Sequence, residues 1–292
     1  MERAREAARK LFDRSRRIAD RELELLFPGI ANCRGTIRSA VPPRNGIGNV
    51  QPYELIVIST ICNYLKPGLV FEFGTFNGMT TLHFAMNSPE SARVVTVDLD
   101  PGDPRRELVN DDTYYISDNQ VGQMFHDAVE RSKIEQIFAD TTTFNHSQYQ
   151  GKADLIFVDA GHEYDLVRSD TEKALDMLAP NGVILWHDYV FSHYGVYTLL
   201  NQLSQSLPLH SIPNATLVCY QSSSTRPDLD SVINDLDEQI GTAEESGRDR
   251  RIFINRMAEG MRRLRKTVTP PGSRRERMAR YLLNPTRQAL QK

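Results

Sequence analysis

The residues best suited to do chemistry follow two apolar runs in the second half of the chain. Asp159 ends the run Ala153–Asp159, and Asp188 ends the run Gly182–Asp188, so each acid follows a predicted buried strand. Ligands of open parallel sheets gather at the carboxyl ends of strands, so we expect both carboxylates in one crevice. Two neighbouring carboxylates repel each other unless a cation or a proton intervenes. A hard divalent ion such as Mg²⁺ suits this pair because it prefers oxygen ligands.

His162 lies three residues after Asp159, on a loop that faces the same crevice. Its imidazole titrates near neutral pH and can take a proton from a hydroxyl group whose acidity a metal has raised. The alternative is a structural histidine that caps the next helix or bonds the backbone. Loop residues beside a crevice are often functional, which favours a general base at His162.

A glycine-bearing turn earlier in the chain predicts a site for a nucleotide-like cofactor. Leu69–Phe73 has the apolar character of a central parallel strand, and Gly74 and Gly78 follow it before a predicted helix from Met79 to Met86. Glycines permit close approach to a ligand, and the helix presents free N–H groups to it. A purely structural turn is the alternative interpretation. The next apolar run places Asp98 about 20 residues further on, where a carboxylate can accept the ribose hydroxyls of such a cofactor.

The form of this turn separates two cofactor classes. Dinucleotide-binding loops carry G-x-G-x-x-G, whereas here an acid precedes two widely spaced glycines, in Glu72-x-Gly74-x-x-x-Gly78. With these features the chain resembles the class I S-adenosylmethionine-dependent methyltransferases, over roughly residues 51–221. The resemblance implies an α/β fold with a Rossmann-like methyltransferase sheet, mostly parallel with a terminal antiparallel pair.

The resemblance also assigns roles around S-adenosylmethionine. Four residues of the turn would surround its methionine part, Asp98 would bind the ribose, and Asp140 would lie near the adenine. A helix N-cap or a turn residue is the alternative for Asp140. The four turn residues are Glu72, Gly74, Thr75 and Gly78.

Within this class, the loop Asp159-x-x-His162 resembles that of the metal-dependent sugar O-methyltransferases and the related cephalosporin-hydroxylase-like group. The resemblance implies that Asp159, His187 and Asp188 hold Mg²⁺ or another divalent metal, and that His162 is the general base. His187 departs from the family pattern, in which an acid occupies this position. Imidazole is a poorer ligand for Mg²⁺ than carboxylate and suits a transition metal better.

These assignments predict an O-methyltransferase that acts on a hydroxyl of a sugar or another small molecule, or of a glycan. The alternatives are a Rossmann-like enzyme that runs different chemistry in the same crevice and a non-catalytic subunit that only binds the cofactor. The presence of Glu72, Asp98, Asp159 and His162 argues against a subunit without a reaction. The sequence does not identify the acceptor.

We expect three parts in the chain: residues 1–50 with an N-terminal helix, the catalytic domain over 51–221, and a helical extension over 222–292. The N-terminal helix would pack on the domain or on a second subunit of a homo-oligomer. Residues 32–51 could form a lid over the cofactor or a simple linker. Near the end of the domain, 209–213 and 215–220 predict the antiparallel pair of strands.

Composition fits a globular cytoplasmic enzyme, since the 292 residues are 40% hydrophobic and the three cysteines lie far apart. The tail differs: residues 248–292 hold 14 Lys or Arg against 3 Asp or Glu, whereas the whole chain carries −3. A helical appendage or oligomerisation arm would explain the tail, as would contact with an anionic membrane surface or glycan. We expect no nucleic acid, because the rest of the chain is acidic and no binding module is recognised.

Overall fold

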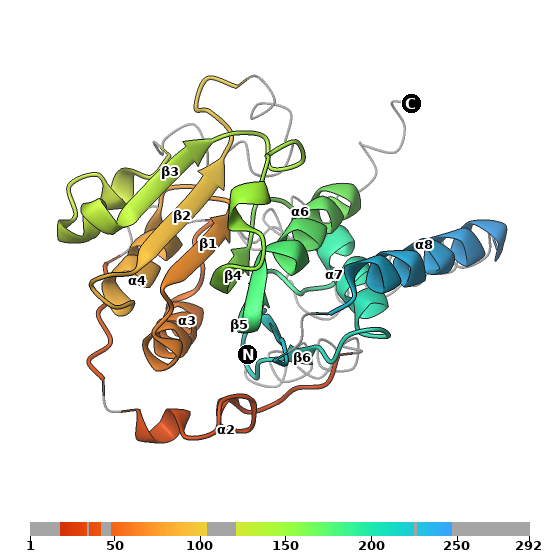
Figure 1. Cartoon of the computed structure of the whole chain (residues 1–292), viewed down its shortest axis with the longest axis horizontal. Helices are drawn as coiled ribbons and strands as arrows, with labels where there is room; N and C mark the ends of the chain where they lie inside the picture. Colours follow the sequence, from red (N-terminus) through yellow and green to blue (C-terminus); the bar gives the residue numbers. More distant parts are fainter. Residues whose placement is uncertain (1–17, 34, 42–47, 104–120, 225–226, 247–292) are drawn as a thin grey trace, which may run out of the picture. The chain divides into compact units, whose positions relative to one another are not determined.

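The computed structural model describes residues 18–33, 35–41, 48–103, 121–224 and 227–246, and Figure 1 shows how their elements are arranged. By its contacts the chain divides into two compact units, and the first, Arg17–Asp235, contains every strand of the described residues. Of the second unit the structure describes only Leu236–Ser246, which belongs to helix α8 (Leu229–Ser246). None of the described helices is both long and apolar enough to cross a membrane.

A seven-stranded sheet forms the centre of the first unit, in the order β3-β2-β1-β4-β5-β7-β6. The first five strands of this order are parallel, and β7 runs antiparallel to both of its neighbours. The predicted fold class, with its terminal antiparallel pair, is therefore confirmed. The strands are β1 Leu69–Phe73, β2 Arg93–Asp98, β3 Ile134–Phe138, β4 Ala153–Val158, β5 Leu178–Trp186, β6 His210–Ser211 and β7 Val218–Gln221.

Helices cover both faces of this sheet (Figure 1). Helices α3 (Pro52–Leu65) and α4 (Met79–Asn87) share a hydrophobic cluster with alternate strand residues such as Leu185. The next residue along β5, Trp186, points to the opposite face and donates its indole N–H to Thr171 of α6 at 2.9 Å. There α6 (Tyr164–Met177) packs against β4, β5 and α7 (Tyr194–Leu203). This two-sided burial explains why the central strands are almost continuously apolar.

The strand register brings the ends of the central strands to one level. Phe73, the last residue of β1, pairs with Val97 in β2 and Val158 in β4, and Val158 pairs with Trp186 at the end of β5. The loops that follow these strands therefore begin side by side. Every acid that the sequence analysis placed after a strand lies along this edge.

Element boundaries differ from expectation in two places. Strand β5 begins at Leu178, ahead of the apolar run from Gly182, and Asn181 adopts a left-handed φ of 60° where the pairing with β4 shifts its register. Strands β6 and β7 cover residues 210–211 and 218–221, whereas the sequence predicted strands over 209–213 and 215–220. In both places the pairing with a neighbouring strand sets the boundary, which local sequence does not reveal.

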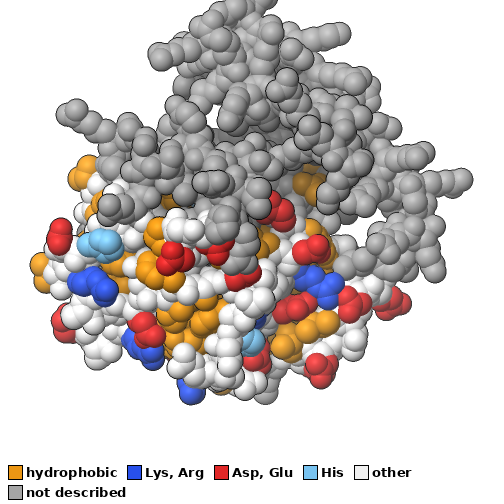
Figure 2. Space-filling model, turned by 90° about the horizontal axis from the view of Figure 1, so that it is seen from above, with side chains coloured by type: hydrophobic (Ala, Val, Ile, Leu, Met, Phe, Trp, Pro, Cys, Tyr) orange, Lys and Arg blue, Asp and Glu red, His pale blue; other side chains and the backbone are white. Residues whose placement is uncertain are grey.

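Much of the two predicted extensions lies outside the described residues. The described N-terminal part holds the short helices α2 (Leu23–Leu26) and η1 (Ile30–Asn32), and residues 1–17 of the predicted N-terminal helix are not described. The same holds for residues 42–47 of the predicted lid and for the basic tail from residue 247 onward. On the face drawn in Figure 2, the described acidic and basic side chains are interspersed around hydrophobic ones.

Candidate functional site

The turn after β1 and the loop after β4 touch each other through Gly74. A Cβ atom on Gly74 would lie 2.4 Å from the carbonyl oxygen of Asp159 and 2.7 Å from the Cα atom of Ala160, and its φ is +96°. Only glycine tolerates both the contact and the backbone conformation. The predicted cofactor turn and the loop that carries Asp159 and His162 are therefore held in direct contact.

Gly78 closes the same turn and precedes α4. Its φ is +84°, and a Cβ atom there would lie 2.5 Å from the Phe125 ring. The N–H of Gly78 bonds the carbonyl oxygen of Thr75 at 2.8 Å, which fixes the turn. The helix N-terminus that the sequence predicted at this edge is thus present.

Glu72 lies completely buried beneath this turn. Its Oε2 atom accepts hydrogen bonds from the hydroxyls of Thr81 and Thr96, the latter at 2.7 Å, and Thr96 also bonds Thr75 at 2.7 Å. The other oxygen, Oε1, has no partner among the described residues. Burial raises the pKa of Glu72 to about 8, so the carboxyl group holds its proton in the neutral range.

Asp98 and Asp140 each bond nearby backbone. Asp98 accepts the N–H of Phe76, inside the glycine turn, at 2.7 Å, and that of Leu99 at 2.7 Å. Asp140 follows β3 and accepts the N–H of Thr142 at 2.9 Å and its hydroxyl at 2.6 Å. Asp140 thus has the turn role considered as its alternative, while the ribose and adenine contacts stay predictions.

His187 lies between carboxylates on both of its ring nitrogens. Its Nδ1 atom is 3.2 Å from an oxygen of Asp159 and 3.5 Å from one of Asp188, whereas Nε2 is 3.1 Å from Glu54. The ring is 10% exposed and the Glu54 side chain 3%. The structure therefore brings together all three predicted metal ligands, Asp159, His187 and Asp188, and adds a fourth group.

Glu54 is the residue of this cluster that the sequence analysis missed. It lies in the first turn of α3, where its Oε2 atom accepts the N–H of Gln51 at 3.1 Å as part of a capping box. Its Oε1 atom accepts the N–H and the hydroxyl of Thr216 at 2.6 and 2.8 Å. The available signal was an acid opening an otherwise apolar helix, and it indicates a cap without indicating His187.

The charges of this cluster shift its pKa values in opposite directions. Burial alone would lower the pKa of His187, but the charge and hydrogen bond of Asp159, with Asp188 and Glu54, raise it well above 6.5. Burial would raise the pKa values of Asp188 and Glu54, yet both are lowered, chiefly by bonds from His162 and His187 to Asp188 and from His187 to Glu54. Asp159 has a raised pKa because its burial dominates.

The donor set fits a divalent ion. One donor atom each of Asp159, His187 and Asp188 lie within 4.8 Å of one another. An octahedral ion with bonds of about 2.1 Å holds adjacent ligands roughly 3 Å apart. The distances of 3.2 and 3.5 Å from His187 Nδ1 to the oxygens of Asp159 and Asp188 are close to that value. The bond from Nε2 to Glu54 is the kind that fixes the tautomer of a metal-bound histidine. Because one donor is an imidazole, the set suits a transition metal better than Mg²⁺.

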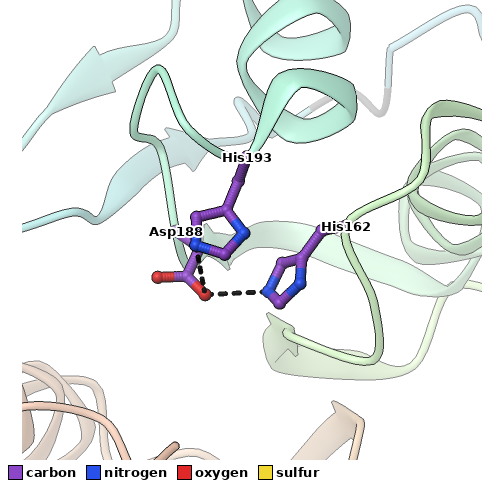
Figure 3. A group of neighbouring side chains, drawn as sticks. All are labelled: His162, Asp188 and His193. Carbon is purple, nitrogen blue, oxygen red and sulfur yellow. Dashed lines mark hydrogen bonds and ion pairs between the residues drawn. The ribbon is translucent and has the colours of Figure 1, made fainter. Parts of the chain in front are cut away.

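His162 contacts the other oxygen of Asp188, and a second histidine joins it (Figure 3). The His162 Nε2 atom is 2.8 Å from Asp188 Oδ2, and the His193 Nε2 atom is 4.0 Å from the same oxygen. The two imidazole rings lie 4.0 Å apart between centroids. His193, the residue before α7, was not predicted, because nothing in its local sequence distinguishes it.

The bond to Asp188 decides which nitrogen of His162 carries a proton. The pKa of Asp188 is lowered, so this carboxylate is ionised and can only accept hydrogen bonds. His162 therefore donates from Nε2, and in the neutral ring Nδ1 is the nitrogen that carries the lone pair. The backbone of Asp188 is in the left-handed region, with a φ of 58°, which is uncommon for a residue other than glycine.

Comparison with protein families agrees with this architecture. Residues 71–189, from β1 to the site loop after β5, match the family model described as a methyltransferase domain. This stretch is therefore similar to a methyltransferase domain, and the sheet has the strand order of the class I, Rossmann-like fold. No curated protein matches the sequence.

Several solved structures are similar at low identity. A methyltransferase from Geobacter sulfurreducens is 19% identical, with a TM-score of 0.45, and the match covers 60% of this chain and 81% of that one. A SAH-bound methyltransferase from Podospora anserina is 15% identical with a TM-score of 0.46, covering 71% and 99%. An O-methyltransferase from Bacillus cereus in complex with SAH is 14% identical with a TM-score of 0.42, covering 60% and 84%.

Proposed function

We propose that this protein transfers a methyl group from S-adenosylmethionine to a hydroxyl group of a sugar or another small molecule. The observation that supports this most directly is the contact of Gly74 with Asp159 and Ala160. It joins the turn that would hold the cofactor to the loop that carries His162. A methyl donor bound at the turn and an acceptor beside His162 would then be neighbours.

His162 would act as the general base in this reaction. Its Nε2–H is held by Asp188 at 2.8 Å, which orients the ring and leaves Nδ1 to accept the proton of the hydroxyl group. The oxygen would attack the sulfonium methyl group as S-adenosylhomocysteine leaves on the opposite side. Because the donor is already activated, positioning of the two substrates should supply much of the rate enhancement.

A divalent metal would be held by Asp159, His187 and Asp188, with Glu54 supporting His187. When bound there, such an ion would supply Lewis acidity toward the acceptor oxygen. The pair Glu54 and Thr216 would keep the His187 ring in place whether or not a metal is bound, since Glu54 accepts two bonds from Thr216. Glu72 would contribute from below the turn by holding Thr81 and Thr96.

Binding of S-adenosylmethionine, measured by calorimetry on the full chain with and without Mn²⁺ and Mg²⁺, tests the cofactor. A panel of sugar and phenolic acceptors with radiolabelled methyl donor then tests the reaction. We expect His162→Ala to bind the cofactor like the wild type and to lose methyl transfer by about 10²–10⁴-fold. A chain that binds S-adenosylmethionine but methylates no hydroxyl would instead support the binding-only alternative.

His146→Ala is the matched control for that experiment. His146 lies outside the site, and its Nε2 atom bonds Asp176 at 3.0 Å, so it is another partly buried His–Asp pair. Its loss should leave methyl transfer unchanged. If both variants lost activity equally, the effect would come from destabilisation and His162 would not be the base.

A further inference from the structure

Asp188 takes part in two separate groups of metal-binding side chains. Its Oδ1 atom faces His187 at 3.5 Å, on the side of Asp159. Its Oδ2 atom faces His162 at 2.8 Å and His193 at 4.0 Å. The second group, two imidazoles and one carboxylate, shares only Asp188 with the proposed site of Asp159, His187 and Asp188.

The second group has the composition and spacing of a zinc site. One donor atom each of His162, Asp188 and His193 lie within 4.8 Å of one another. Tetrahedral zinc with bonds of about 2.0–2.2 Å separates its ligands by roughly 3.3–3.6 Å. The 2.8 Å pair would open and the 4.0 Å pair would close by less than about an ångström, which small rotations of the side chains allow.

The elements that carry these side chains leave the group accessible. His162 precedes α6, His193 precedes α7, and both rings point toward the carboxylate of Asp188 in Figure 3. The three side chains are 27%, 32% and 23% exposed, in the order His162, His193, Asp188. Three protein ligands with access from solvent leave a fourth position for water, as in open zinc sites.

We propose that His162, Asp188 and His193 bind a second divalent ion, of the zinc type, and that its binding switches off the base of the proposed methyl transfer. The proposed switch, unlike the proposed zinc site, rests on the proposed function. A metal needs a neutral imidazole with a lone pair on the bound nitrogen. Zinc on Nε2 of His162 therefore moves the ring proton from Nε2 to Nδ1. With its proton on Nδ1, the ring no longer accepts a proton from the acceptor hydroxyl.

Zinc binding to chelator-treated full-length protein tests the site without any assay of activity. Equilibrium dialysis followed by elemental analysis gives the zinc bound per chain for the wild type, His193→Asn and the control His146→Asn. We expect His193→Asn to bind one zinc ion fewer than the wild type, or to bind that ion at least about tenfold more weakly. His146→Asn should match the wild type. Equal zinc binding by His193→Asn and the wild type would overturn the site.

Inhibition tests the switch once an acceptor is found. Added zinc should inhibit methyl transfer by the wild type and by His146→Asn, and should inhibit His193→Asn at least about tenfold less strongly. Equal inhibition of all three would overturn the switch even if the site binds zinc. A protein that shows the zinc difference without any methyl transfer would retain the site and refute the proposed function, so the two failures are distinguishable.

Discussion

The two sides of Asp188 differ in how much water reaches them. On one side the side chains of His187 and Glu54 are 10% and 3% exposed, and both ring nitrogens of His187 contact carboxylates. On the other side His162 and His193 are 27% and 32% exposed. An enclosed group with satisfied polar atoms is suited to hold a fixed position, whereas an accessible group can exchange protons or ligands. Asp188 therefore connects an enclosed group that is suited to a fixed position with an accessible group that is suited to exchange.

Replacement of the shared residue should have the largest effect, because it damages both sides. We expect Asp188→Asn to lower methyl transfer by about 10³-fold or more, since the amide no longer favours the productive orientation of His162. Kinetics with saturating S-adenosylmethionine measure this loss, and circular dichroism checks the fold. A variant with more than a tenth of wild-type turnover would show that the two sides work independently.

A comparison of Asp170 with Asp188 separates two influences on the pKa of a carboxyl group, namely burial and a histidine partner. Asp170 is 1% exposed, and burial raises its pKa to about 7, although the neighbouring Thr141 acts to lower it. Asp188 has a lowered pKa because histidines bond it. The folded chain thus binds the Asp170 proton more tightly than the unfolded chain, so this group makes stability fall as pH rises from about 4 to about 7.

Asp170→Asn should remove the loss of stability that the ionisation of Asp170 causes as pH rises. Relative to the wild type, we expect the free energy of unfolding of the variant to improve by roughly 2–3 kcal/mol between pH 5 and pH 8. Urea denaturation at the two pH values measures the difference. An unchanged difference would mean that Asp170 ionises normally inside the fold, and burial alone would then not set these pKa values.

Glu54→Gln tests the enclosed side alone. The amide keeps the size of the side chain but removes the charge that His187 and Thr216 bond. We expect Mn²⁺ affinity to fall by about 10–100-fold, as for other partners of a metal-bound histidine, while zinc binding at His193 stays the same. Calorimetric titration with each metal measures both. A parallel loss of the two affinities would remove the distinction between the sides.

His193→Asn should have the smallest effect of the series when no zinc is present. His193 is 4.0 Å from Asp188, beyond hydrogen-bonding distance, so the Asp188–His162 bond does not depend on it. We expect turnover within about threefold of the wild type in zinc-free buffer that contains Mn²⁺ or Mg²⁺. A loss approaching that of Asp188→Asn would place His193 in the reaction itself.

The sequence was sufficient to bring two residues together in space where each of them directly follows a buried strand. Asp159 and Asp188 come together because β4 and β5 are parallel neighbours with matching ends, and apolar runs predict such strands. Glu54 could not be found in this way. It is 133 residues from His187 and reaches it only because α3 packs across the sheet with its first turn beside this edge.

His193 escaped prediction for a related reason. Its side chain meets His162 because the chain turns back between β5 and α7, with the N–H of His193 bonded to the carbonyl oxygen of Val190. Local sequence gives the residue type but not the direction of such a turn. The roles of Asp98 and Asp140 at the cofactor stay predictions, because the contacts of both carboxylates described above are with nearby residues of the chain.

The left-handed backbone of Asp188 limits how this edge can be redesigned. With φ at 58°, position 188 accommodates Asp, Asn or Gly far better than branched or bulky residues. A mutant library meant to broaden acceptor range would therefore yield few folded variants if it randomised this position. Directed evolution would do better to keep Asp188 fixed and vary the exposed residue Tyr194 at the start of α7.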